Sequence, residues 1–140
     1  MIKKTIKYQD WNGVEREEDF YFNLTKTELA HMQFEEGGDY ATRVRNIIRA
    51  KDTAAIMKIF ESIVLTAYGE KSEDGRRFVK SPEIAKAFTE TAAYDQLYFE
   101  LLSNPDEFAD FVNRLIPSDL ASKMEEMKAS GKLPELLETM

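Results

Sequence analysis

The chain contains no cysteine and only one histidine in 140 residues. The lack of cysteine excludes disulfide bonds, thiol nucleophiles and cysteine-based zinc sites, and it suits a reducing compartment without requiring one. The single histidine, His31, has Glu28 and Glu35 one helical turn away on either side. That spacing arises readily on an acidic helix, and the second histidine of an HExxH zinc motif is missing. We therefore expect no metal site.

Long hydrophobic runs are also missing. Residues 1–6 carry two lysines but lead into no apolar stretch of the about 7 to 15 residues that a signal peptide needs. No window approaches the roughly 20 apolar residues of a membrane-spanning helix. We expect a protein that stays in the cytoplasm.

Basic residues are fewer than acidic ones: 19 Lys and Arg stand against 26 Asp and Glu, which gives a net charge of −7 and a pI near 4.9. Nucleic acids and anionic membranes favour Lys and Arg, because these release counterions on binding, so neither is an expected partner. The hydrophobic share of 43% lies in the range of ordinary globular proteins, and the chain is long enough for one core.

The most continuously hydrophobic stretch lies between Asp52 and Gly69. Asp52 can accept hydrogen bonds from the first free amides of a helix, and Gly69 can adopt the left-handed conformation that closes one. We predict that this stretch is the central helix of the core. Its apolar residues recur at the i, i+3, i+4, i+7 spacing of a broad helical face: Ile56, Ile59, Phe60, Ile63, Val64, Ala67 and Tyr68.

A β-hairpin is predicted over residues 2–22. Ile2, Ile6 and Tyr8 share one face of the first strand, and Phe20 and Phe22 share a face of the second. Residues 10–13, Asp-Trp-Asn-Gly, are a turn signal between the strands. Since a lone hairpin is only marginally stable, we expect the two phenylalanines to pack on the helices that follow.

Capping residues mark the other helices. Thr25 and Glu28 form a capping box, which predicts a helix that begins at Lys26 and ends before the glycines at 37–38. A short helix over residues 40–51 precedes the central one. A polar turn and a brief extended piece at 76–79 follow it, and then three more helices begin after the caps Ser81, Thr91 and Asn104. Their inward faces carry Ile84, Ala87, Phe88, Tyr94, Leu97, Tyr98, Leu101, Leu102, Phe108, Phe111, Val112, Leu115 and Ile116, and Pro117 ends the last.

The fold class that follows is mainly α (α+β). Residues 1–117 are expected to form one globular domain, in which the hairpin precedes a compact bundle of about six to seven helices. Residues 118–140 are a separate amphipathic segment that begins at Ser118 and is rich in methionine. Methionine suits adaptable binding surfaces. The candidate partner-binding residues are therefore Met124, Met127, Leu133, Leu136, Leu137 and Met140; a loosely docked terminus is the open alternative.

No arrangement of residues predicts an active site. The glycines at 69 and 75 are separated by five residues, where a phosphate-binding loop has four, and Arg76-Arg77 replace its Lys-Ser/Thr pair. These arginines are expected to pair with Glu70, Glu73 or Asp74 across a surface turn. No turn has the alternating oxygen donors of a calcium loop. We expect no catalytic residue, no cofactor and no metal ion.

Two blocks of the sequence resemble a known family. The first is residues 20–29, FYFNLTKTEL, and the second is residues 68–81, YGEKSEDGRRFVKS; shorter matches lie at 85–88 and 92–95. Together they resemble tail assembly chaperones of long-tailed, siphovirus-type bacteriophages and prophages of Gram-positive bacteria. The similarity extends through residue 117, and it carries over no individual functional residue.

The resemblance implies an assembly factor in the host cytoplasm. Such a protein coats the tape measure protein, keeps that long hydrophobic helical protein soluble, and recruits major tail protein subunits; it is absent from the finished tail. In many of these phages a programmed frameshift produces a longer form. Self-association into oligomers is a further expectation from the family.

Two other functions are alternatives. A small phage-encoded DNA-binding or transcriptional regulator is disfavoured by the net negative charge and by the lack of a basic recognition helix. A small hydrolase that uses Glu or Asp is disfavoured because paired carboxylates such as Glu17-Glu18 and Glu125-Glu126 are adjacent in sequence, so their side chains point apart.

Overall fold

A computed structural model of the chain describes residues 1–35 and 40–116. The described part has a mixed α+β fold, in which six helices accompany a four-stranded antiparallel sheet of strand order β1-β2-β3-β4. The expected helical domain with an N-terminal hairpin is confirmed in outline, but the sheet is larger than predicted. In chain order the elements are β1 (Ile2–Gln9), β2 (Glu15–Phe22), α1 (Lys26–Glu35), α2 (Tyr40–Ala50), α3 (Thr53–Ala67), β3 (Tyr68–Lys71), β4 (Phe78–Val79), α4 (Pro82–Thr89), α5 (Ala92–Ser103) and α6 (Pro105–Leu115).

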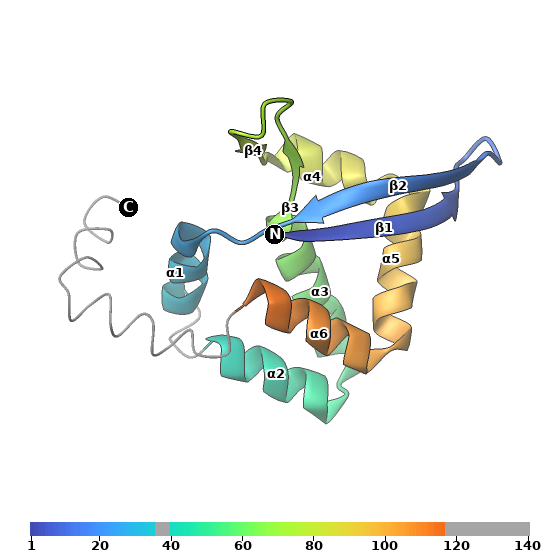
Figure 1. Ribbon diagram of the computed structural model, residues 1–140. Helices are drawn as coiled ribbons and strands as arrows, with labels where there is room; N and C mark the ends of the chain where they lie inside the picture. Colours follow the sequence, from blue (N-terminus) through green and yellow to red (C-terminus); the bar gives the residue numbers. More distant parts are fainter. Residues whose placement is uncertain (36–39, 117–140) are drawn as a thin grey trace.

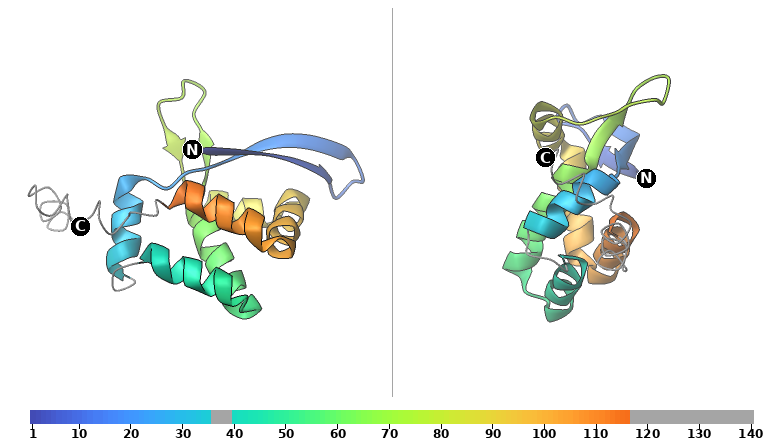
Figure 2. Two further views of the ribbon diagram at one scale, coloured as in Figure 1. Left: turned by 60° about the horizontal axis from the view of Figure 1, so that its bottom comes forward. Right: turned by 90° about the vertical axis from the view of Figure 1, so that its left-hand side faces the viewer.

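The hairpin of β1 and β2 forms as its alternating pattern predicts. The two strands pair along their full length, with Ile2 opposite Phe22, and Gly13 closes the turn at φ 79°. Ile2, Ile6 and Phe22 are buried. Figure 1 shows the hairpin extending beyond the helices at its turn, and Figure 2 shows from two other sides that the helices lie to one side of it. The inner face of the hairpin therefore joins the core while its turn projects.

The core is built around α3 and a group of aromatic rings. Phe60, Ile63 and Val64 of α3 are fully buried. The ring of Phe22 lies 5.4 to 5.9 Å from the rings of Tyr68, Phe88 and Phe111, measured between centroids. Tyr68 stacks on Phe88 at 4.0 Å. The hairpin thus packs on the helices through its phenylalanines, as expected.

The predicted helix starts are confirmed, with the cap atoms in place. Glu28 N–H donates to Thr25 Oγ1 at 3.1 Å, and Thr25 N–H donates to Glu28 Oε1 at 2.9 Å, which completes the capping box. Four other caps each accept a hydrogen bond from the backbone three residues on: Asp52, Ser81, Thr91 and Asn104.

The predicted end of the central helix is wrong. α3 ends at Ala67, and Tyr68 is extended, with φ −67° and ψ 136°. Gly69 does not take a left-handed conformation; it pairs with Tyr21 in the sheet. A Cβ at Gly69 would lie 2.8 Å from the ring of Phe78 and 2.9 Å from the carbonyl oxygen of Val79. The glycine is needed because β4 approaches β3 so closely.

Two smaller predictions are also wrong. Ala87 is exposed, because the inward face of α4 follows Ile84 and Phe88, which lie four residues apart. Arg76 and Arg77 are expected from the sequence to pair with Glu70, Glu73 or Asp74, but the ion pairs within residues 1–35 and 40–116 include none of these. The Asp74 carboxylate accepts hydrogen bonds from Ser72 Oγ at 2.7 Å and from the backbone N–H of Arg76 at 3.0 Å. Short side chains and backbone amides shape this turn.

Several predictions lie outside the described residues. These concern the glycines at 37–38, Pro117, the segment that begins at Ser118, and the whole candidate set at Met124, Met127, Leu133, Leu136, Leu137 and Met140. Of the helices that the structure describes, none has the length and apolar character of a membrane span.

Candidate protein-binding surfaces

The only histidine, His31, belongs to no cluster of potential metal ligands in the described part of the chain. Glu28, its possible partner from the sequence, is used elsewhere: its two carboxylate oxygens lie 2.7 and 2.9 Å from Lys80 Nζ. Within residues 1–35 and 40–116, no group of three or more His, Cys, Asp or Glu side chains is placed to hold a metal ion.

The two sequence blocks that carry the family resemblance meet in the fold. Tyr21 and Phe22 of the first block pair with Gly69 and Tyr68 of the second. Lys80 Nζ also donates to the carbonyl oxygen of Asn23 at 2.6 Å, in addition to its contacts with Glu28. The junction of β2, α1 and the β3–β4 ribbon is therefore one structural unit built from residues 20–29 and 68–81.

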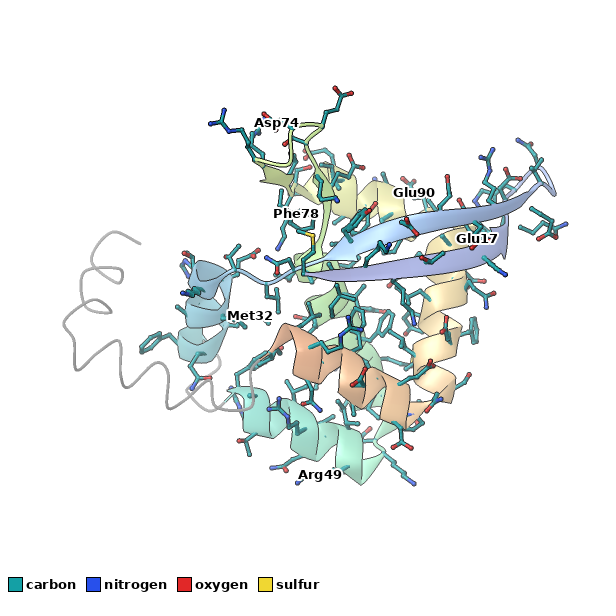
Figure 3. The ribbon with its side chains drawn as sticks, viewed as in Figure 1. Glu17, Met32, Arg49, Asp74, Phe78 and Glu90 are labelled. Atoms are coloured by element: carbon teal, nitrogen blue, oxygen red, sulfur yellow. The ribbon has the colours of Figure 1, made fainter. Side chains whose placement is uncertain are left out.

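A groove lies beside this junction, between the edge of β2 and the β3–β4 ribbon. It has a volume of about 480 Å³, and its lining includes residues 18–21 of β2 and 68–73 of β3 and the following turn. Figure 3 labels Glu17 on the hairpin and Asp74 in the turn between β3 and β4, each next in sequence to residues that line the groove. The two walls of the groove therefore come from the hairpin and from the β3–β4 ribbon.

The groove is acidic. Its lining carries four carboxylates and one ammonium group, which belong to Glu18, Asp19, Glu70, Glu73 and Lys71. The ammonium group of Lys71 lies over the ring of Tyr21, 4.3 Å from its centroid. The lining thus has an excess of negative charge, which favours a cationic ligand or partner.

Tyrosines near the groove stay neutral over a wide pH range. Desolvation, followed by the hydrogen bond that Tyr8 donates to Glu18, raises the pKa of Tyr8 to about 12. Burial raises the pKa of Tyr68, and the charges of Glu70 and Glu18 add to that effect. These phenols can therefore donate hydrogen bonds but add no negative charge near neutral pH.

The hairpin turn presents the only tryptophan of the chain. Trp11 is 76% exposed, yet its Nε1–H donates to the carbonyl oxygen of Glu90 at 3.0 Å. The Asp10 carboxylate accepts hydrogen bonds from two turn amides and from Arg16 Nε at 2.6 Å. The hydrogen bond from Arg16 is the main cause that holds the pKa of Asp10 below its usual value. An exposed aromatic ring on a braced turn suits protein contact.

The described helices offer only scattered apolar contacts. Their predicted apolar stripes face the core, as the buried Phe60, Leu97 and Phe111 show. The large exposed apolar side chains on these helices belong to Phe34, Met57 and Phe99, each on a different helix. The groove could not be predicted from the sequence, because its walls come from segments that are about 50 residues apart in the chain.

The comparisons with known proteins identify the family. A family model described as "Phage tail assembly chaperone" matches residues 1–139. No curated protein and no solved structure matches the chain. The family match spans nearly all of the sequence, including the two blocks that meet beside the groove. The chain therefore belongs to the phage tail assembly chaperone family.

Proposed function

We propose that this chain binds the tape measure protein, keeps it soluble, and recruits major tail protein subunits while the tail tube is assembled. The observation that carries the proposal is the family match over residues 1–139. A tail assembly chaperone interacts with tail proteins, and a long hydrophobic helical protein is the one most in need of cover. The chain acts in the cytoplasm of a Gram-positive host, on the tail of a siphovirus-type phage, and is absent from the finished tail.

The binding surface for apolar helices is proposed to lie in residues 118–140. The described helices direct their stripes into their own core, so they leave few apolar side chains for a partner. The sequence of the last segment supplies the missing apolar positions, at Met124, Met127, Leu133, Leu136, Leu137 and Met140. An amphipathic segment of this kind can cover an apolar helix of another protein. Family membership favours a role without catalytic turnover.

Co-expression tests the proposal. The tape measure protein is produced with and without this chain, and its soluble fraction is measured; we expect solubility to depend on the chain. A variant carrying Met124→Gln, Met127→Gln, Leu133→Gln and Leu136→Gln should lose the effect. Met57→Gln, at a methionine that is 38% exposed on α3, is the matched control and should retain it. Equal solubility of the tape measure protein with and without the chain contradicts the proposal.

Self-association is proposed to use the same terminal residues. Light scattering should then show a mass that rises with protein concentration, and the rise should be lost in the four-residue variant but not in Met57→Gln. An unchanged mass in the four-residue variant removes these residues as the contact surface between copies.

A further inference from the structure

Strand β2 has a long unpaired edge in the part of the chain that the structure describes. β1 covers one edge of β2 along all eight residues, whereas β3 pairs with the other edge only at Tyr21 and Phe22. β3 then leads away from the hairpin into the β3–β4 turn (Figure 1). Residues 15–20 therefore have no described strand on that side. Such an edge is a template for an added strand.

Hydrogen bonds beyond the two ends of β2 show which backbone groups face the open edge. Asn23 N–H donates to Ala67 O on the β3 side, and Asp10 N–H donates to Val14 O on the β1 side. Backbone groups of successive residues point to opposite edges of a strand, so odd-numbered residues point their N–H and C=O groups toward the open side. Three acidic residues hold these positions: Glu15, Glu17 and Asp19.

The side chains of the same three residues form an exposed row on one face of the sheet. On the β1 side the row has neighbours: Lys7 Nζ lies 4.0 Å from Glu17, and Thr5 Oγ1 donates to Asp19 at 2.6 Å. An antiparallel strand on the open side would place every second side chain opposite these carboxylates, with Cβ atoms about 4.5–5.5 Å apart. Basic side chains at those positions would therefore be complementary in charge.

The groove beside β2 adds further negative charge that a basic segment could contact. Its opposite wall carries the carboxylates of Glu70 and Glu73, and its one lysine, Lys71, is already placed over Tyr21. Phe20 and Tyr68 contribute aromatic surface to the lining. A segment lying in the groove would thus meet negative charge on both sides and aromatic rings beneath its alternate side chains. The chain's net charge of −7 would attract a basic segment from a distance as well.

We propose that the open edge of β2 binds an extended, basic segment of a partner protein as an added antiparallel strand. The segment has Lys or Arg at every second position, opposite Glu15, Glu17 and Asp19, and β-branched or aromatic residues between them. This inference does not rest on the tape measure protein as the partner, because it concerns an extended basic chain and not an apolar helix.

A synthetic peptide tests the site directly. The probe is fluorescently labelled acetyl-Thr-Lys-Val-Lys-Val-Lys-Val-Thr-amide, and its polarization is measured against the full-length chain. We expect saturable binding that weakens as salt is added. A second peptide with Glu in place of each Lys should not bind. A third peptide with N-methylated Lys amides keeps every charge but loses the edge hydrogen bonds, and it should bind at least about tenfold more weakly.

Matched protein variants separate the site from general charge. Glu15→Gln, Glu17→Gln and Asp19→Asn together should weaken binding of the first peptide by about tenfold, since three facing charges are lost. The control combines Glu61→Gln, Asp95→Asn and Asp110→Asn, which are exposed on three helices and change the net charge by the same amount. This control should bind the first peptide almost as tightly as the unsubstituted chain does. Hydrogen exchange should also slow at the amides of residues 15, 17 and 19 when the peptide binds.

Three results would overturn the inference. Equal binding of the N-methylated peptide, or equal weakening by both triple variants, would mean only diffuse attraction between charges. Failure of the peptide to bind, together with a concentration-dependent mass that the first triple variant abolishes, would mean that a second copy occupies the edge. The peptide assay contains no tail protein, so its outcome is independent of the tape measure experiment.

Discussion

The two halves of the β1–β2 hairpin differ in what holds them in place. The half near the chain terminus is fixed by apolar packing, with Phe22 fully buried among three aromatic rings. The half near the turn is fixed by polar contacts, such as those of Asp10 with Arg16 and of Trp11 with Glu90. Burial of apolar surface contributes more to stability than exposed hydrogen bonds do. One half of the hairpin is therefore part of the hydrophobic core, while the other half is held by hydrogen bonds at the surface.

The largest loss of stability is expected from Phe22→Ala, in the half of the hairpin that packs into the core. Removing the ring leaves a cavity at the contact of Tyr68, Phe88 and Phe111, and we expect a loss of about 3–5 kcal/mol in the free energy of unfolding. Urea denaturation followed by circular dichroism measures the loss. Phe34→Ala, at a ring that is 47% exposed on α1, is the control and should change stability much less. Similar losses for both variants would contradict the conclusion that burial of the Phe22 ring is what fixes this half of the hairpin.

Gly69→Ala tests the junction between the buried half of the hairpin and the β3–β4 ribbon. The added methyl group would lie under 3 Å from the ring of Phe78 and from Val79 O, so either β4 or the ring must shift. We expect a loss of about 1–3 kcal/mol, measured by urea denaturation. Gly75→Asn serves as the control, because Gly75 has open space around its Cα and Asn tolerates its φ of 72°. A neutral Gly69→Ala would show that the close approach of β4 has no energetic weight.

The same junction shows where sequence reasoning works and where it stops. Helix starts at Lys26 and Thr53 could be predicted, because a cap and its bonded amide lie three residues apart. Strand β3 could not be predicted, because Tyr68 continues the helical spacing of α3. The residue that Tyr68 pairs with, Phe22, is 46 residues earlier in the chain. The groove depends on that pairing, so it appears only once the fold is known. Capping residues close together in sequence therefore predict the helices, whereas the groove depends on pairing between strands that are far apart in the chain.

Acid should loosen the polar half before it affects the buried half. The pKa of Asp10 is held below its usual value, mainly by the hydrogen bond from Arg16, so its ionised form is favoured in the folded chain. The resulting stabilisation is fully present above the unfolded pKa of about 3.9 and is lost as the pH falls through the lower folded value. Trp11, the only tryptophan, reports on the turn by its fluorescence.

We expect the Trp11 fluorescence of the unsubstituted chain to change below about pH 4. Asp10→Asn retains an oxygen that can accept from the turn amides but has no carboxylate to titrate. Its fluorescence should therefore vary much less over the same range. An identical acid response in both proteins would place the titrating group elsewhere.

The smallest effect is expected from Trp11→Phe. The substitution removes one exposed hydrogen bond, from Nε1–H to Glu90 O, and keeps an aromatic ring, so the free energy of unfolding should fall by less than about 1 kcal/mol. Hydrogen exchange should nonetheless quicken at the Gly13 amide, which bonds to Asp10 O within the turn. Glu90→Gln leaves the accepting carbonyl in place and should change neither quantity. A loss as large as that of Phe22→Ala would mean that the turn is part of the core's cooperative unit; a small loss with faster local exchange would mean that a partner can move this half of the hairpin at little cost to the fold.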